Sequence, residues 1–296
     1  MTRRSVNLLA KVTRILPFSC VDGPGSRLVI FLQGCNYQCI NCHNPHTINH
    51  CNHCNHCGDC VSEYPVGALK FDESNNVVWL KEECTHCDRC TEICQHQSNP
   101  KITDYSVEAM LDLIRKQRFF ISGVTVSGGE STLQLPFIIA LFKGIKQDPE
   151  LQYLTCFIDS NGSLSTSGWE RVLPYMDGAM IDLKSWQSET HHWLVGRDNH
   201  RVFQTIQYLA QVDKLYEVRL LHIPGKSDLD TEVMMVGHYL QALPESVNIR
   251  LNAFQHHGVV GEAQEWEKCS KGEMERFHAR LSQFVSRPVN MPSVYV

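Results

Sequence analysis

The hydrophobic pattern of the chain alternates between short apolar runs and longer segments whose apolar residues recur at helical spacing. The segment Arg27–Leu32 contains five consecutive apolar residues, which is typical of a strand buried on both faces of a parallel sheet. Five further apolar runs predict five more strands. They are Gly123–Val126, Leu154–Ile158, Ala179–Ile181, Glu217–His222 and Asn248–Leu251.

Helical segments separate these strands. Between positions 106 and 119, Val107, Met110 and Ile114 share one helical face, and Ser106 is suited to cap the first turn. The other expected helices are Pro136–Gln147, Gly168–Tyr175, Arg201–Val212, Asp230–Leu243 and Gly272–Val285. Six strand–helix units in succession predict an α/β fold with right-handed crossovers.

Polar and glycine-rich signatures directly follow the expected strands. They are Gly34–Cys35, Ser127–Glu130, Asp159–Gly162, Asp182–Lys184, His222–Gly225 and Asn252–His257. Functional residues at the carboxyl ends of consecutive parallel strands are typical of (β/α) barrels. We therefore expect a partial (β/α)6 barrel, open at six strands. Residues 1–45 and 106–296 form it, and residues 46–105 are an insert in the first crossover.

Composition and charge argue against two broad classes of protein. Charged residues make up 20% of the chain and the net charge is -5, whereas general nucleic-acid binders tend to be basic. The longest uncharged apolar stretch, Leu135–Phe142, is too short to cross a bilayer. Lys11 and Arg14 interrupt any apolar core of a signal peptide. We expect a cytoplasmic protein.

The cysteines are concentrated in one part of the chain. Of the fourteen, eleven lie between Cys35 and Cys94. In a reducing compartment this density indicates metal or redox chemistry rather than disulfides. Cys20, Cys156 and Cys269 lie elsewhere, and we expect each to be a small buried apolar residue.

The first three of the eleven have the spacing C-x3-C-x2-C. Cys35, Cys39 and Cys42 can hold three corners of a cubic [4Fe–4S] cluster, which leaves the fourth iron open to a substrate. A zinc site completed by His43 or His46 is the alternative, because three cysteines and a histidine also suit zinc. The strand that leads into this loop and the five other strand-end loops favour the cluster.

These residues resemble a known family. The C-x3-C-x2-C spacing is the signature of radical S-adenosylmethionine enzymes, and with five further segments it resembles the enzymes that activate glycyl-radical enzymes. The segments are Asp22–Arg27, Cys42–Asn44, Ser127–Glu130, Asp159–Gly162 and Asp182–Lys184. The resemblance covers nearly all 296 residues, and the combination is far more specific than any single motif.

The resemblance implies a site for S-adenosylmethionine. Its expected residues are Asn41, Cys42 and His43 at the adenosine part, Gly128, Gly129 and Glu130 at the methionine ammonium, and Leu183 and Lys184 beside them. Glycines suit such a site because they permit close approach of the backbone.

Two finer expectations follow from the same resemblance. A monovalent cation near the methionine carboxylate is implied, and its expected ligands are Asp159, Ser160, Asp182 and the backbone of Met180. Relatives also carry a histidine after the aromatic residue of the last strand, where this chain has Gln255. Gln255, His256 and His257 are therefore all candidates for that contact.

The implied reaction is an oxidation–reduction. An electron from flavodoxin or ferredoxin enters the cluster, and S-adenosylmethionine is cleaved to methionine and a 5′-deoxyadenosyl radical. The radical takes a hydrogen from a glycine α-carbon of a partner glycyl-radical enzyme, whose identity is open. The cofactors perform the chemistry, so we expect no further catalytic residue, and we expect a monomer. Radical chemistry on a small molecule and a zinc-dependent binding module are the alternatives.

The insert carries two ferredoxin-like cysteine runs, Cys51–Pro65 and Cys84–Cys94. The second run has the C-x2-C-x2-C-x3-C spacing of bacterial ferredoxins, in which the fourth cysteine ligates the cluster of the other run. The runs therefore predict two additional iron–sulfur clusters. Zinc is again the alternative, since several histidines lie nearby.

The first run allows two registers. In the favoured register Cys54, Cys57 and Cys60 lead, and Tyr64 takes the fourth position before the proline. Cys94 then completes the cluster of these three cysteines. A phenol is a poor iron ligand at its normal pKa of about 10, so Tyr64 contributes nothing to the second cluster.

The cluster of the second run is incomplete in this register. Cys84, Cys87 and Cys90 hold it, with water or Cys51 in the fourth position, and it is expected to be labile. In the other register Cys51, Cys54 and Cys57 lead, and Cys60 crosses over although it arrives one residue early.

Overall fold

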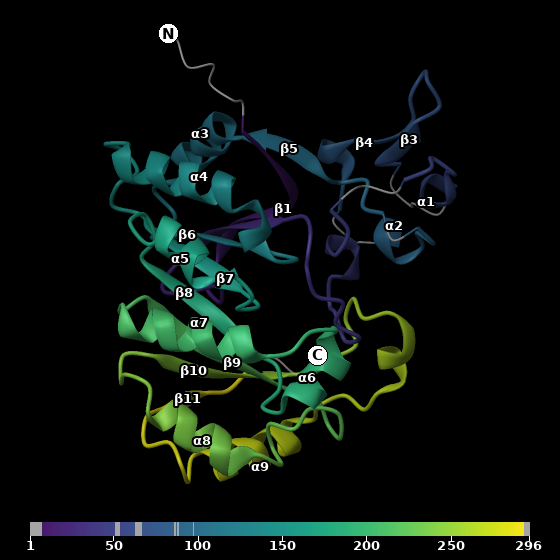
Figure 1. The fold of residues 1–296 in the computed structure, drawn as a ribbon. Helices are drawn as coiled ribbons and strands as arrows, with labels where there is room; N and C mark the ends of the chain where they lie inside the picture. Colours follow the sequence, from purple (N-terminus) through teal and green to yellow (C-terminus); the bar gives the residue numbers. More distant parts are fainter. Residues whose placement is uncertain are drawn as a thin grey trace.

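The structure, a computed structural model, describes residues 8–50, 54–62, 67–85, 87, 89–96 and 98–292. Within these residues a sheet of nine strands runs through the molecule (Figure 1) in the order β11-β10-β9-β8-β7-β6-β2-β1-β5. Its strands are β1 (Leu9–Ser19), β2 (Arg27–Leu32), β5 (Thr103–Ser106), β6 (Gly123–Gly128), β7 (Thr155–Ser160), β8 (Gly178–Leu183), β9 (Leu215–His222), β10 (Asn248–Ala253) and β11 (Val289–Asn290).

The six expected strands are confirmed as β2, β6, β7, β8, β9 and β10, and neighbouring members pair in parallel. They follow one another across the sheet in chain order. Right-handed crossovers that always step in the same direction place their helices on the same face, as in a barrel. Figure 1 shows α3, α4, α5, α7 and α8 stacked along that outer face. The fold is thus the expected barrel type, not a doubly wound sheet.

All six expected helices are present, with ends shifted by a few residues. They are α3 (Val107–Gln117), α4 (Leu135–Gln147), α5 (Thr166–Val172), α7 (His200–Gln211), α8 (Val233–Gln241) and α9 (Lys271–Leu281). The hydroxyl of Ser106 accepts a hydrogen bond from the Ala109 amide, which confirms the expected cap of α3. Within the described barrel residues, one further helix, α6 (Ser188–Val195), was not expected.

The strands at the two edges of the sheet were also missed. β1 pairs antiparallel with both β2 and β5, and β11 is a two-residue strand beside β10. In β1 the apolar pattern is interrupted by Lys11, Arg14 and Pro17, which are exposed although the strand pairs with β2 and β5. β5 consists of Thr103–Ser106, so the last three residues of the expected insert, 103–105, belong to the sheet.

Arg27, at the amino end of β2, links three strands of the barrel. Its side chain is fully buried. The guanidinium donates to the hydroxyls of Thr125 and Thr155 at 2.8 and 2.7 Å and to three backbone carbonyls. These bonds satisfy a buried charge and tie β2, β6 and β7 together at the end opposite the polar loops.

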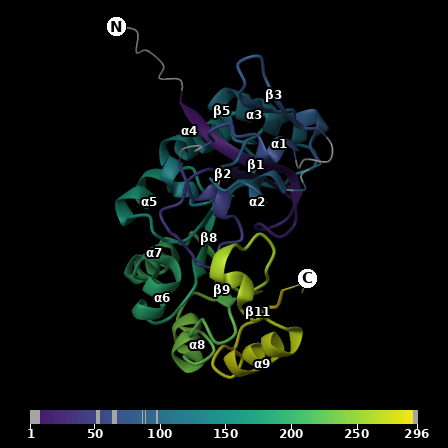
Figure 2. The ribbon, with the colours of Figure 1, turned by 90° about the vertical axis from the view of Figure 1, so that its right-hand side faces the viewer.

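The insert packs around a small core of its own. Its elements are η1 (Pro45–Thr47), α1 (Asp59–Ser62), β3 (Leu69–Phe71), β4 (Val77–Trp79), η2 (Lys81–Glu83) and α2 (Arg89–Glu92). Ala68, Leu69 and Cys90 are buried together there, apart from the main core. Figure 2 shows the insert beside β1 and β5, at the end of the sheet opposite α8 and α9.

The isolated cysteines behave differently from one another. Cys156 and Cys269 are buried, as expected, but Cys20 is exposed on the loop after β1. The expectation for Cys20 is therefore wrong, because the residue lies in an exposed loop rather than in the packed core. No helix in the described part of the chain has the length and apolar content of a membrane-spanning segment.

Candidate functional site

A cavity of about 490 Å³ lies at the carboxyl ends of the parallel strands. Nine of the residues expected to bind S-adenosylmethionine or its cation line it: Asn41, Cys42, His43, Gly128, Gly129, Asp159, Ser160, Asp182 and Lys184. Cys35 and Cys39 line it as well. The barrel therefore brings together loops that are more than 140 residues apart in the sequence.

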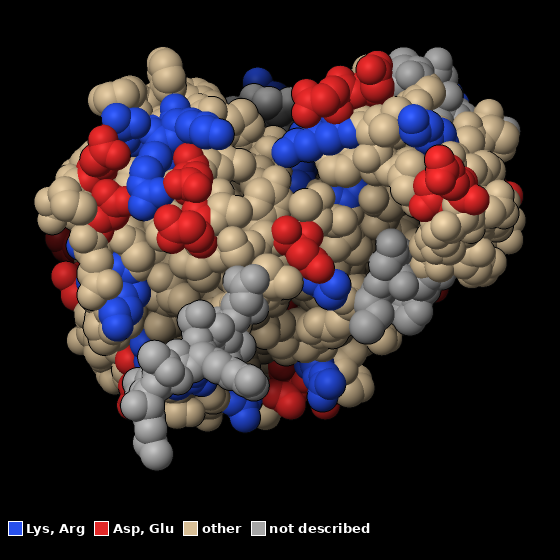
Figure 3. Space-filling view, turned by 90° about the horizontal axis from the view of Figure 1, so that it is seen from above, with Lys and Arg blue, Asp and Glu red and all other residues tan. Residues whose placement is uncertain are grey.

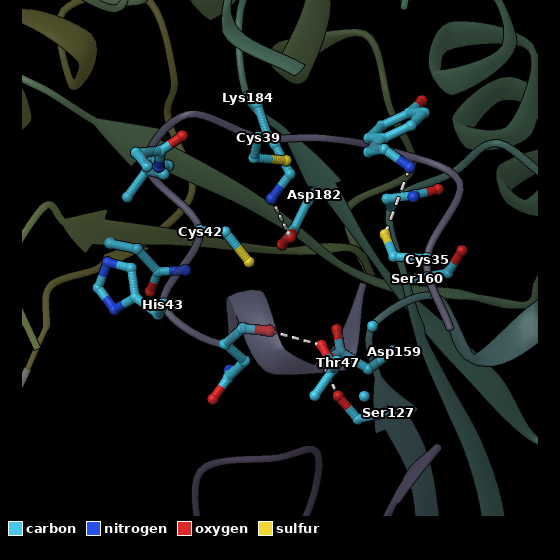
Figure 4. A pocket seen from close by; sticks show the side chains of 18 of the residues that line it. Cys35, Cys39, Cys42, His43, Thr47, Ser127, Asp159, Ser160, Asp182 and Lys184 are labelled. Atoms are coloured by element: carbon cyan, nitrogen blue, oxygen red, sulfur yellow. Dashed lines mark hydrogen bonds and ion pairs between the residues drawn. The ribbon is translucent and has the colours of Figure 1, made fainter. Parts of the chain in front are cut away.

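The three cysteines of the C-x3-C-x2-C loop face this cavity from different sides (Figure 4). The loop is held in place through its backbone. Cys35 N donates to the Ile48 carbonyl at 2.9 Å, and Gln38 N and Ile40 N each donate at 3.0 Å to the last two carbonyls of α6. The unexpected helix α6 thus serves as a support for the cysteine loop.

Burial controls the protonation of the three thiols. It raises the pKa of Cys35 to about 12 and that of Cys39 to about 11, and it also raises the pKa of Cys42. The ammonium of Lys184 opposes the shift at Cys39 and Cys42. Thiolates are favourable here only beside additional positive charge, which the iron ions of a cluster would supply.

The donor set fits a cluster better than a single zinc ion. Within the described ranges, no three His, Cys, Asp or Glu side chains converge closely enough to hold one metal ion. A four-iron cluster spaces its sulfur ligands more widely than a tetrahedral zinc ion does. The arrangement of Cys35, Cys39 and Cys42 around an open space suits the wider spacing.

Lys184 and Asp182 form an ion pair at the end of β8, with Nζ 2.8 Å from Oδ2. Burial alone would lower the pKa of Lys184, but the carboxylate of Asp182 and the nearby thiols outweigh it and raise that pKa. Lys184 is therefore a fixed positive charge beside Cys39 and Cys42. Figure 4 shows the pair pointing into the space between the cysteines.

Asp159 does not offer a free carboxylate to a monovalent cation. One oxygen accepts from the Ser127 hydroxyl at 2.8 Å, and the other lies 3.1 Å from the guanidinium of Arg219. Burial raises the pKa of Asp159, and Arg219 acts against this shift. Because Asp182 is paired with Lys184, both expected carboxylate ligands already have a cationic partner.

Glu130 lies behind the cavity wall instead of in it. It is 1% exposed, and its carboxylate accepts hydrogen bonds from the amide and hydroxyl of Thr132, the hydroxyl of Ser160 and the amide of Asn161. In this geometry Glu130 does not reach the cavity, where the methionine ammonium was expected. Glu130 instead fixes the ends of β6 and β7 to each other.

The glycines beside Glu130 do line the cavity. Gly128 has a φ of 129°, and a Cβ on Gly129 would lie 2.4 Å from the carbonyl oxygen of Gly34. A side chain at either position would therefore force the β6 loop away from the loop that carries Cys35.

Two buried polar atoms in the cavity wall have no hydrogen-bond partner among the described residues. They are Oδ1 of Asn41 and Nε2 of His43. Burial, together with the charges of Lys184 and His257, lowers the pKa of His43 to about 4, so its ring is neutral near pH 7. An unpaired acceptor and a neutral ring suit a polar heterocycle such as adenine.

The loop after β10 separates its three candidate residues. The Gln255 amide donates to the Cys269 carbonyl at 3.0 Å, and His256 Nε2 donates to the Trp266 carbonyl at 2.7 Å. His257 lies close enough to His43 to lower its pKa. None of the three is among the cavity-lining residues, and Leu183 is buried in the main core.

Several cavity residues were missed by the sequence reasoning. Tyr37 lies inside the cysteine loop and Asn252 lies in β10. Asp22 belongs to a segment that supported the family resemblance but was given no role in binding. Arg219 contacts the site through Asp159. It lies in the middle of β9, so no strand-end signature marked it.

In the insert, four cysteines lie around one small hollow of about 20 Å³. They are Cys54, Cys57, Cys60 and Cys94. These are the cysteines that share a cluster in the favoured register. Of the other run, Cys90 is buried, Cys84 is half-buried and Cys87 is exposed. Cys51 and Tyr64 lie outside the described residues.

Residues 21–203 match a protein family described as a 4Fe-4S single cluster domain. Pyruvate formate-lyase 1-activating enzyme of Escherichia coli (strain K12) is 27% identical over 293 residues, which cover 93% of this chain and 98% of that protein. A putative glycyl-radical enzyme activating enzyme of Haemophilus influenzae is 27% identical over 271 residues, 84% of each chain.

Among solved structures, a radical SAM methyltransferase from Sphaerobacter thermophilus superposes with a TM-score of 0.56 at 12% identity, over 98% of this chain and 78% of that one. At this identity the likeness concerns the fold alone. The family match and the relatives carry the identification. The chain belongs to the 4Fe-4S single cluster domain family, and over most of its length it is similar to proteins named as activating enzymes of pyruvate formate-lyase and of glycyl-radical enzymes.

Proposed function

We propose that the protein activates a glycyl-radical enzyme by forming a radical on a glycine of that partner. The observation that carries the proposal is the convergence of Cys35, Cys39 and Cys42 with the Gly128–Gly129 backbone and the Lys184–Asp182 pair in one cavity. Bound there, the cluster and S-adenosylmethionine would supply the electron transfer and bond cleavage that yield methionine and a 5′-deoxyadenosyl radical.

The residues of the chain bind and orient these groups. Cys35, Cys39 and Cys42 would hold three irons and leave the fourth to the amino and carboxylate groups of the cofactor. The unpaired atoms of Asn41 and His43 would meet the adenosine part. The backbone at Gly129 provides room for the methionine part, because no side chain intervenes.

The size and shape of the cavity agree with this assignment. Its volume of about 490 Å³ lies within the usual range for small-molecule and cofactor sites, roughly 300–1,000 Å³. Glycine is a suitable target for the radical, since no side chain blocks its α-carbon and both flanking amides stabilise the product radical. A protein partner must therefore present its glycine on a narrow loop.

We further propose that the insert passes electrons from flavodoxin or ferredoxin to the cavity. The grouping of Cys54, Cys57 and Cys60 with Cys94 supports one cluster in the insert. Cys84, Cys87 and Cys90 would hold the second. The proposal needs no monovalent cation, because Asp159 and Asp182 already have Arg219 and Lys184 as partners.

The test is electron paramagnetic resonance on candidate partners. The reconstituted enzyme, S-adenosylmethionine and a reductant are incubated anaerobically with each glycyl-radical enzyme of the source organism. A doublet with α-proton splitting on one partner, which is absent when Cys39→Ala replaces the wild type, supports the proposal. Cleavage of S-adenosylmethionine without a doublet on any partner favours a small-molecule substrate instead.

A further inference from the structure

A second cavity lies between the insert and the open edge of the barrel sheet. Its volume is about 380 Å³. On the barrel side it is lined by β1, β5 and α3, and on the insert side by β4, η2 and α2. Three residues, Phe31, Asn44 and Thr47, line both this cavity and the cavity of the cysteine loop, here called the reaction cavity. The two are therefore separated by a thin wall.

The charge of this second cavity has one sign. Arg14, Lys81 and Lys101 line it, and among its described lining residues none is acidic. Lys101 is only 6% exposed. The whole chain has a net charge of -5, and Figure 3 shows acidic and basic side chains interspersed on the face seen from above. The charged residues of this lining are therefore all basic, which is a local feature that favours an anion.

A buried hydrogen-bond donor points to the same ligand. Trp79 lines the cavity, and its buried Nε1 has no partner among the described residues. An indole N–H is a donor only, and a buried donor without an acceptor is unfavourable. Lys81, two residues further along the chain, places its Nζ 3.4 Å from the hydroxyl of Tyr105 across the cavity.

Part of the remaining wall is apolar, and the other part consists of neutral polar side chains such as Thr13, Asn99 and Gln117. Val12, Ile15, Phe31 and Leu113 contribute aliphatic and aromatic surface. The volume of about 380 Å³ lies within the range of small-molecule sites, roughly 300–1,000 Å³, so the cavity suits a small ligand. A ligand with an acceptor group at the basic residues and an apolar body against the apolar residues would complement both parts of the lining.

We propose that this cavity binds a small organic anion, a carboxylate or a phosphate attached to an apolar or aromatic body. The acid group pairs with Lys81 and Arg14 and accepts the hydrogen bond of Trp79. The body lies against the sheet edge. The site is distinct from the reaction cavity and does not depend on the proposed function.

Calorimetry on the full, anaerobically reconstituted chain tests the proposal. Benzoate and phenylphosphonate are the two probes, and benzyl alcohol is the uncharged comparison. We expect one acid or both to bind with a 1:1 stoichiometry and benzyl alcohol not to bind. The preferred acid then distinguishes a carboxylate ligand from a phosphate ligand. Saturating S-adenosylmethionine leaves this binding in place, because it occupies the other cavity.

Three variants locate the bound anion. Lys81→Gln and Trp79→Phe each weaken binding about tenfold, which is the usual effect of losing one charged or buried hydrogen bond. The matched control is Lys11→Gln, a substitution on β1 of a lysine that pairs with Asp104 and does not line the cavity. The Lys11→Gln variant is expected to bind the acid with the affinity of the wild type.

Three results would overturn the proposal. One is no binding of either acid up to about 10 mM. Another is equal affinity of the acid for the wild type and for Lys81→Gln. The side chain of Lys81 is exposed, so this variant is expected to fold normally. The last is displacement of the acid by S-adenosylmethionine, which would place the anion in the reaction cavity.

Discussion

The ammonium of Lys184 lies 2.8 Å from the carboxylate of Asp182, and the two residues are separated by a single position at the end of β8. Asp182→Ala leaves Lys184 unpaired in the cavity, where it no longer has a fixed direction. We expect affinity for S-adenosylmethionine to fall about tenfold, the effect of one charged contact, with little change in melting temperature. Calorimetry and thermal unfolding measure the two quantities.

A matched control for this prediction lies at the other end of the barrel. Lys146 and Asp177 form an ion pair of 2.7 Å, and Asp177 also accepts from the Cys156 amide. Asp177→Ala should lower stability and leave cofactor affinity unchanged. The reverse pattern in the two variants would mean that Asp182 is a structural residue.

Single replacement of Cys35, Cys39 or Cys42 by alanine is expected to abolish cleavage of S-adenosylmethionine while the barrel still folds. Two thiolates do not keep the cluster with its open iron. The product 5′-deoxyadenosine, measured by chromatography, and circular dichroism check the two parts. Cys20→Ala serves as the control because Cys20 is exposed and does not line the cavity. Normal product formation by any of the three variants would refute the assignment.

Glu130→Ala should act mainly on stability. The substitution leaves the buried donors of Thr132, Ser160 and Asn161 without their acceptor. We expect the free energy of unfolding to fall by about 3 kcal/mol. Glu130→Gln is also destabilising, because its amide group brings a donor to a site that needs acceptors. A variant with wild-type stability in urea and weakened cofactor binding would restore the contact expected from the sequence.

The registers of the insert are separable by iron analysis. Cys94→Ala should remove the cluster of Cys54, Cys57 and Cys60, because all four thiols lie around one hollow. Tyr64→Cys should raise the iron content, since it supplies the missing ligand of the second run. Cys51→Ala should change little. Loss of a whole cluster in that variant, seen as about four irons per chain, would show that the other register is right.

Protonation of His191 should destabilise the protein in acid. His191 is fully buried, Nδ1 donates to the Arg197 carbonyl, and burial lowers its pKa. The unfolded chain therefore binds the proton more tightly than the folded chain. The neutral ring's contribution to stability is complete above the unfolded pKa of about 6.5 and is lost as pH falls through the lower folded value.

His191→Gln should reduce the difference in unfolding free energy between about pH 7 and pH 5. Urea titrations at several pH values measure this difference. His192→Gln is the control, since His192 is the next residue on α6 and is exposed. An unchanged slope in His191→Gln would assign the pH dependence to other groups.

The sequence pattern predicted the parts of the fold that are buried on both sides. The strand β2 and the helix α3 were recognised because burial imposes a regular apolar pattern. The strand β1 was missed, since Lys11, Arg14 and Pro17 occupy exposed positions that interrupt its apolar pattern. Sequence patterns identify a strand through its buried positions, and β1 has fewer of them than β2.

For the site, residue type was easier to predict than side-chain direction. Asp159, Asp182 and Lys184 all line the cavity because the carboxyl ends of parallel strands meet there. Glu130 follows the same rule in position but turns into the wall, where four donors surround it. Competition between ligand and backbone donors for one carboxylate depends on contacts between distant loops, and a single sequence does not reveal those contacts.

The backbone anchors of the cysteine loop bear on how the protein is assembled in the cell. Because Cys35, Gln38 and Ile40 are bonded to Ile48 and to α6, the loop keeps its shape as part of a large folded core. Among the described residues of the insert, three apolar residues are buried in a core of its own, so we expect its folding to depend more on the clusters proposed for it. Oxygen damage at the proposed barrel cluster should therefore be repairable by simple reloading, whereas loss of the clusters proposed for the insert should expose that segment to proteolysis.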